Sequence, residues 1–188
     1  MPIDRDAALG FMYANARLLD RHRLAVLQRR ASAGVVVEAV RPYRNADGGF
    51  GHALEPDVRA PESEPSSTLQ ALEILAEVGR LDDPMVADAA AWVSTIAHDD
   101  GSVPFVLPTA AAYPHAPWMV PSSGGSHLTF GMVAALCRSG VGGAWLERAT
   151  QWCWERLEQP DQLSAYWVKF ALDFLDRVPD EARARTVI

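Results

Sequence analysis

Lysine is almost absent from this chain of 188 residues: Lys169 is its single lysine, and arginine carries nearly all of the positive charge. Acidic residues outnumber basic ones, which gives a formal net charge of -7 at pH 7. Proteins that bind nucleic acid neutralise phosphates with an excess of lysine and arginine, and this composition has no such excess. We therefore expect no nucleic-acid partner.

Cysteine is equally scarce. Cys137 and Cys153 are the only two, and both fall in apolar helical patterns, where an unpaired cysteine behaves as a small hydrophobic residue. This excludes a scaffold held by disulfides. The first residues lack the features of a signal peptide, and no apolar run approaches the ~18 residues of a membrane span. We expect a cytoplasmic protein without a membrane span.

The sequence also has no convincing strand pattern, whereas apolar residues recur at helical spacing along most of its length. The length suits one globular core, so we predict a single all-α domain over residues 1–188. Helices are expected near residues 4–22, 35–43, 66–79, 83–98, 127–139, 144–158 and 161–178, with a last turn after 179. The predicted N-caps are Asp4, Ser66 or Ser67, Asp83 and Asp161. Residues 102–126 form a long loop.

Parts of the chain repeat. The dipeptide Asp47-Gly48 returns as Asp100-Gly101, and the segment 71–79 resembles 132–140. A period of this kind, with two helices joined through a glycine turn, is typical of repeat architectures. We place the repeats at about residues 1–80, 81–140 and 141–188. The chain stops inside a predicted helix, so we expect the C-terminus to be truncated.

The turn Asp47-Gly48-Gly49-Phe50-Gly51, followed by a loop and Leu69-Gln70-Ala71-Leu72, resembles the repeat of terpenoid cyclases and protein prenyltransferase β subunits, the squalene cyclase type of repeat. The resemblance covers about residues 34–158. It implies an α/α toroid in which helical hairpins surround a central apolar cavity. The three to four hairpins predicted here would form an incomplete ring, which a second protomer of a homo-oligomer could complete.

The catalytic signatures of that family are mostly missing. The nearest approach to the aspartate-rich acid motif is Glu55-Pro56-Asp57, so these two carboxylates are the candidate catalytic residues. Two nearby carboxylates can raise one another's pKa and supply a general acid. The prenyltransferase zinc site needs an aspartate two residues before a cysteine. Ala135 and Gln151 stand at those positions, so zinc is not expected.

The remaining candidates would bind the ligand. Arg44 and Arg59 could hold a diphosphate, which Mg²⁺ would accompany, although an internal ion pair is the structural alternative. The aromatic residues of the long loop could wall the cavity or simply anchor the loop. The full set of candidate substrate-binding residues is His52, Arg44, Arg59, Tyr113, His115 and Trp118, and no metal site is predicted among them.

Three functions stay open at this point. The first is binding or conversion of a small apolar, isoprenoid-type ligand in a central helical cavity. The second is a non-catalytic toroid-like binding or assembly module. The third is carbohydrate chemistry, since other α/α toroids use paired carboxylates in a central groove. Fold resemblance alone does not choose between them.

Overall fold

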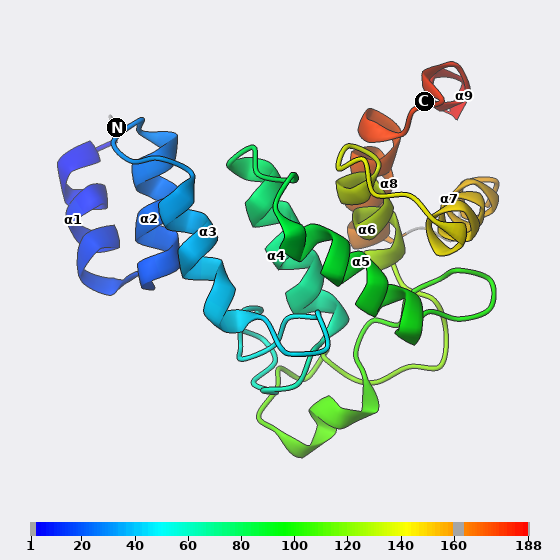
Figure 1. The fold of residues 1–188 in the computed structure, drawn as a ribbon, viewed down its shortest axis with the longest axis horizontal. Helices are drawn as coiled ribbons and strands as arrows, with labels where there is room; N and C mark the ends of the chain where they lie inside the picture. Colours follow the sequence, from blue (N-terminus) through cyan, green and yellow to red (C-terminus); the bar gives the residue numbers. More distant parts are fainter. Residues whose placement is uncertain (1–2, 160–163, 188) are drawn as a thin grey trace.

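The computed structural model describes residues 3–159 and 164–187, and the chain is all-α, as the sequence predicts. The described part holds isolated bridges but no strand. The predicted N-cap Asp161 lies outside the described residues. The elements in chain order (Figure 1) are α1 (Arg5–Asn15), α2 (Leu18–Leu27), α3 (Gly34–Val40), η1 (Arg41–Tyr43), α4 (Pro65–Glu77), α5 (Pro84–Ile96), η2 (Pro108–Ala112), α6 (Leu128–Leu136), α7 (Ala144–Leu157), α8 (Ala165–Arg177) and α9 (Glu181–Val187).

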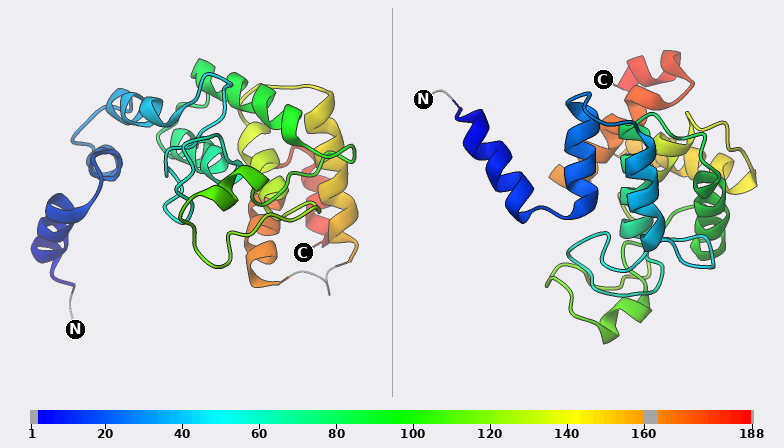
Figure 2. Two further views of the ribbon diagram at one scale, coloured as in Figure 1. Left: turned by 90° about the horizontal axis from the view of Figure 1, so that it is seen from below. Right: turned by 60° about the vertical axis from the view of Figure 1, so that its left-hand side comes forward.

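The first predicted helix is two helices. Asp4 caps α1 as expected, with its carboxylate accepting from the Ala7 N–H at 3.0 Å, but the backbone turns extended at Ala16. Arg17 donates to Asp20 inside α2 and to the carbonyl oxygen of Leu54, so its side chain ties the break to a distant loop. Within the described chain α1 buries none of its side chains, and it stands apart from the rest of the molecule (Figure 2).

The second predicted helix is confirmed. Val36, Val37 and Val40 lie on the buried side of α3, which packs against α2. Pro42 does not interrupt α3, because it lies in the one-turn 3₁₀ helix η1 that follows. The expected helix end near Pro42 is therefore correct.

The start of α4 differs from the prediction. The helix begins at Pro65, with Glu64 as N-cap residue, and Ser66 and Ser67 already lie inside it. The Ser67 hydroxyl does not cap the helix, because it accepts the backbone N–H of Glu55 at 3.3 Å. Proline suits the first helical position, where its missing N–H costs no hydrogen bond.

The C-terminal helices pack around α6. This helix contacts α4, α7 and α8, and all nine of its residues are buried (Figure 1).

The prediction that Asp83 is the N-cap of α5 is confirmed: its carboxylate accepts the Met85 N–H at 3.0 Å. The toroid arrangement and a ring-completing protomer stay predictions.

Two turns in the chain are built alike. We call residues 47–50 the first turn and residues 100–103 the second turn. Asp47 Oδ1 accepts the N–H two residues on at 3.0 Å, and Asp100 Oδ1 does the same at 2.9 Å. The N–H of the fourth turn residue then donates to a buried helix hydroxyl, Thr68 Oγ1 at 3.0 Å in the first turn and Thr129 Oγ1 at 2.9 Å in the second.

Glycine is required at the second position of both turns. Gly48 has φ +96° and Gly101 has φ +90°, which is left-handed backbone that other residues rarely adopt. A Cβ atom on Gly48 would lie 2.7 Å from the Asp88 carbonyl oxygen of α5. A Cβ on Gly101 would lie 2.5 Å from the Ala149 nitrogen of α7. Each turn is therefore pressed against the backbone of a later helix.

Each turn leads into a connector that ends at a buried helix. The first connector is residues 51–64, before α4, and the second connector is residues 104–127, which contains η2 and precedes α6. The two connectors pack on each other around a small cluster of buried residues at the lower edge of Figure 1. The members of this cluster are Val58, Ala60, Val106, Ala110 and Met119. The long predicted loop is therefore an ordered part of the structure.

No helix in the described ranges has the length and apolar character needed to cross a bilayer.

Candidate functional site

A pocket of about 760 Å³ lies where the two connectors meet α4, α6 and α8. This volume is in the range of small-molecule binding sites, about 300–1,000 Å³. Each of these elements supplies side chains to it. The described lining residues are Glu55, Asp57, Ser66, Leu69, Gln70, Glu73, Phe105, Trp118, Met119, His127, Leu128, Ser164, Tyr166, Trp167 and Phe170.

One face of α4 brings polar groups to the pocket. Ser66, Gln70 and Glu73 are spaced by four and three residues, so they share one side of the helix. Among the described residues, Ser66 Oγ and Gln70 Oε1 are buried without a hydrogen-bond partner. A buried polar group normally has a partner, so both atoms indicate hydrogen-bonding capacity that the chain itself does not use.

Aromatic rings around His127 form another part of the lining, which we call the aromatic wall. The rings of Phe105 and Phe170 both lie 5.1 Å from the imidazole, centroid to centroid, and those of Trp167 and Tyr166 lie at 5.9 and 6.0 Å. Burial lowers the pKa of His127 to about 4, and the charge of Lys169 acts in the same direction. The imidazole is therefore neutral at pH 7 and adds no charge to the rings around it.

The two candidate catalytic carboxylates, Glu55 and Asp57, both line this pocket. Glu55 Oε1 accepts the backbone N–H of Asp57 at 3.3 Å, and Asp57 Oδ2 accepts the indole N–H of Trp118 at 3.1 Å. Burial raises the pKa of Glu55 above its ordinary value. The charge of Asp57 also raises it, while the Asp57 N–H and Arg17 act in the opposite direction. Glu55 thus keeps its proton to a higher pH than an ordinary glutamate.

Two further glutamates were not singled out by the sequence. Glu73 lines the pocket, and burial raises its pKa. The charge of Asp173 adds to the rise, while Lys169, Arg177 and Arg23 act in the opposite direction. Glu64 is completely buried, and its carboxylate accepts the Leu107 N–H at 3.0 Å and the Thr109 hydroxyl at 3.3 Å. Burial raises the pKa of Glu64 to about 7. Glu64 therefore joins the first connector to the second one.

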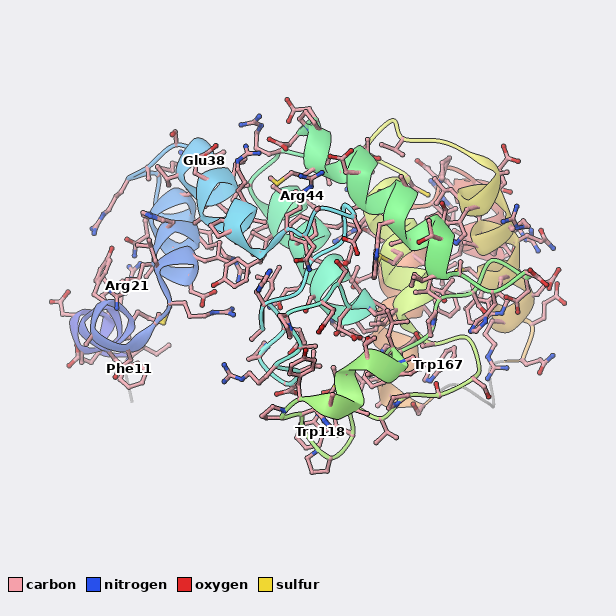
Figure 3. All side chains as sticks on the ribbon, turned by 60° about the horizontal axis from the view of Figure 1, so that its bottom comes forward. Phe11, Arg21, Glu38, Arg44, Trp118 and Trp167 are labelled. Atoms are coloured by element: carbon pink, nitrogen blue, oxygen red, sulfur yellow. The ribbon has the colours of Figure 1, made fainter. Side chains whose placement is uncertain are left out.

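Of the six predicted ligand-binding residues, Trp118 lines the pocket and the other five do not. Arg44 forms an ion pair with Asp88 of α5 at 2.6 Å, and Figure 3 shows it well separated from Trp118. The ion pair predicted as the structural alternative thus exists for Arg44, with Asp88 in place of the acidic loop. The Arg59 side chain is exposed, and its backbone N–H donates to the Pro114 oxygen at 3.0 Å.

The remaining three candidates serve the connectors. His52 Nε2 hydrogen-bonds to Asn45 Oδ1 at 3.0 Å on the exposed side of the first turn. The Tyr113 hydroxyl donates to Glu62 at 2.8 Å, and His115 Nδ1 donates to the Tyr113 carbonyl oxygen at 2.7 Å. Of the eight residues selected from the sequence, the structure brings Glu55, Asp57 and Trp118 together.

A second pocket, of about 510 Å³, adjoins the first along α4, because Gln70 and Glu73 line both. It contains three arginines, Arg23, Arg138 and Arg177. Arg23 is paired with Glu77 at 2.7 Å. Three arginines therefore line the pocket that shares Gln70 and Glu73 with the first one.

In residues 3–159 and 164–187, no group of three or more histidine, cysteine, aspartate or glutamate side chains is arranged to hold a metal ion. Comparisons with protein-family models, with curated proteins and with solved structures gave no match to this chain. The resemblance to terpenoid cyclases and prenyltransferases accordingly stays a prediction.

Proposed function

We propose that the protein binds a small ligand with an apolar, isoprenoid-type body in the pocket between the connectors and α4, α6 and α8. The observation that carries this proposal is the aromatic wall around the neutral His127, which lines the same cavity as the carboxylates Glu55 and Asp57. Burial of each CH₂ group of a ligand against such a wall contributes about 0.8 kcal/mol to binding.

A diphosphate head bound by Arg44 and Arg59 is not part of this proposal. Arg44 is paired with Asp88, and Arg59 points to solvent. The described lining of the pocket contains three carboxylates and neither arginine nor lysine. A diphosphate there would be repelled, so neither the anion nor an accompanying Mg²⁺ ion is expected.

Glu55 and Asp57 have different roles in the proposed chemistry. Glu55 keeps its proton to a higher pH than an exposed glutamate, which is the property that a general acid needs near neutral pH. It would donate this proton to a carbon atom of a ligand double bond, and the bond's electron pair would form the new C–H bond. The resulting carbocation would lie beside the Asp57 carboxylate and the ring faces of the wall.

The binding step is tested with geraniol, which has an isoprenoid body and no charge. We expect saturable binding by calorimetry, weakened about tenfold in Trp118→Ala and in Tyr166→Ala. Both rings are mostly exposed, so these variants should fold normally. The matched control is Phe11→Ala, because Phe11 is a similarly exposed aromatic residue on α1, far from Trp118 (Figure 3). Equal binding by all three variants would contradict the proposal.

The catalytic step is tested in D₂O by mass spectrometry of the recovered ligand. Protonation of a double bond followed by proton loss leaves deuterium in the ligand, and Glu55→Gln should abolish this exchange while it retains binding. Binding without exchange in the wild-type protein would instead support the non-catalytic binding module.

A further inference from the structure

The pocket is acidic as well as aromatic. Glu55, Asp57 and Glu73 all line it, whereas arginine and lysine do not occur among its described lining residues. A cleft that carries charge of one sign between low-dielectric walls concentrates ligands of the opposite sign. Its three carboxylates therefore favour a positively charged ligand, while the charge of Lys169 acts on the His127 and Glu73 part of the lining.

Asp57 and Trp118 combine two cation-attracting groups into one unit. The indole N–H donates to Asp57 Oδ2 at 3.1 Å, which holds the carboxylate at the edge of the ring. The Trp118 side chain is 64% exposed, so a ligand can reach it. A cation over the indole is attracted by the negative ring face and by the adjacent carboxylate together.

Cations of the chain already contact two other rings of the wall. The Arg156 guanidinium carbon lies 5.0 Å from the Trp167 ring centroid, and Lys169 Nζ lies 4.2 Å from that of Phe170. Among the described residues, Trp118 and Tyr166 have no such cation. Phe105 has none either, but it is only partly exposed, so Trp118 and Tyr166 are the exposed rings that a cation of the ligand can reach.

Ser66 supplies an independent sign of a missing ligand. Its residue is 7% exposed and lines the pocket, and within the described structure its hydroxyl oxygen has no hydrogen-bond partner. An ammonium group has three N–H donors and no acceptor. A donor-rich ligand group suits an acceptor set made of carboxylates, a serine hydroxyl and the Gln70 carbonyl oxygen.

We propose that the pocket binds an organic ammonium ion, with the charged nitrogen over Trp118 and against the Asp57 carboxylate. The apolar body of the ligand then lies along the aromatic wall. This inference rests on the proposed function for the body of the ligand and adds the charge of its polar end. It is independent of whether Glu55 catalyses a reaction.

The test compares ligands with one hydrocarbon body and different charges. Geraniol is neutral, geranylamine is cationic and geranyl diphosphate is anionic; propylamine carries the ammonium group with almost no apolar body. We expect geranylamine to bind at least about tenfold more tightly than geraniol, and geranyl diphosphate to bind most weakly of the geranyl series.

The outcomes separate the two proposals. Equal affinities for geranylamine and geraniol, or the tightest binding by geranyl diphosphate, would overturn the ammonium site while leaving the apolar pocket in place. Equal affinities for propylamine and geranylamine would support the ammonium site and overturn the proposed apolar ligand.

A pair of matched variants locates the charge. Asp57→Asn should weaken geranylamine binding about tenfold more than it weakens geraniol binding, because only the amine loses a charged partner while the amide oxygen can still accept the Trp118 N–H. Asp99→Asn makes the same change of charge at an exposed position outside the pocket lining and should alter neither ligand. If both variants lose the same affinity for geranylamine, the overall charge of the protein explains the effect, and the proposed ammonium site is overturned.

Discussion

The first and second turns share one construction but lead into different connectors. In the first, the Phe50 carbonyl oxygen accepts the Glu64 N–H at the end of the connector, at 2.8 Å. In the second, the Val103 carbonyl oxygen accepts the Ser126 N–H at 2.9 Å. Ser126 then uses its hydroxyl locally, accepting the Leu128 N–H at 3.2 Å. Glu64 instead reaches across to the second connector.

This difference separates scaffold from site. The shared parts are an aspartate, a glycine and a helix threonine. In both turns they attach the turn to the buried helix that follows its connector. The unshared parts are Glu55, Asp57 and Trp118 in the connectors, and these line the pocket. Loops held by a rigid scaffold are where binding and catalytic residues usually lie.

The largest effect should come from adding a methyl group at either turn glycine. Gly48→Ala and Gly101→Ala each combine an unfavourable φ with a clash against a helix backbone. We expect each to lower the free energy of unfolding by about 3 kcal/mol, as measured by urea denaturation. If only one of them is destabilising, the two turns are not equivalent.

Gly79→Ala is the matched control for this comparison. Gly79 also has a positive φ, +69°, but in the described structure no atom lies within 4 Å of a Cβ built there. It should lose only the conformational part of the penalty, about 1 kcal/mol. A loss as large as that of Gly48→Ala would show that the helix contact is unimportant.

The second largest effect on stability should come from Glu64→Gln, which changes the first connector alone. Its folded pKa of about 7 exceeds the ordinary 4.5, so the folded state binds more protons and its stability falls as pH rises through this window. In Glu64→Gln this loss is absent. The stability of the variant relative to wild type should therefore improve by about 2 kcal/mol between pH 5 and pH 7.

His127 provides the opposite sign in the same pH range. Its pKa is lowered from 6.5 to about 4, so its contribution to stability is lost as pH falls through that window. The difference between Glu64→Gln and wild type cancels the His127 contribution, since both proteins contain it. If the difference in unfolding free energy between Glu64→Gln and wild type does not change with pH, the pKa of Glu64 is not raised.

The smallest effect should come from the helix threonines. Thr68→Val and Thr129→Val remove the hydroxyls that accept the Phe50 and Val103 N–H groups, and leave a buried donor unpaired. We expect a loss of about 1.5 kcal/mol in each, by thermal or urea unfolding. Equal losses of stability would support the equivalence of the two turns. If neither variant loses stability, the threonine hydroxyls do not contribute to holding the turns.

Local signals in the sequence predict much of the fold. Asp83 before Pro84 correctly places the start of α5, because capping is decided within a few residues. The same reasoning fails at α4, where Ser67 and Gln70 satisfy the capping pattern but Ser67 bonds to Glu55 from another segment. The break at Ala16 was also missed, since it depends on the contact of Arg17 with Leu54 rather than on glycine or proline.

The site is predictable only in part for the same reason. Glu55 and Asp57 were found because they lie together in one loop. Glu64 and Glu73 carry no local mark, since their burial is created by residues more than forty positions away, such as Leu107 and Thr109 for Glu64. Tyr166 is not among the candidates selected from the sequence, yet it is 71% exposed and borders the pocket.

The close contact beside each turn has an evolutionary consequence. In the first copy a Cβ on Gly49 would collide with Ser63 and Trp92, and in the second a Cβ on Gly125 would collide with Ser102 and Trp152. The third residue of the first turn is Gly49, which packs against Ser63. The third residue of the second turn is Ser102, which packs against Gly125. The hydroxyl reaches the turn aspartate in both, from Ser63 at 2.7 Å or from Ser102 at 2.7 Å. Selection on such a pair would act on the summed volume and the single hydroxyl of the two residues. Serine and glycine can therefore exchange places between the two turns, and a position-by-position alignment would score the exchange as two mismatches.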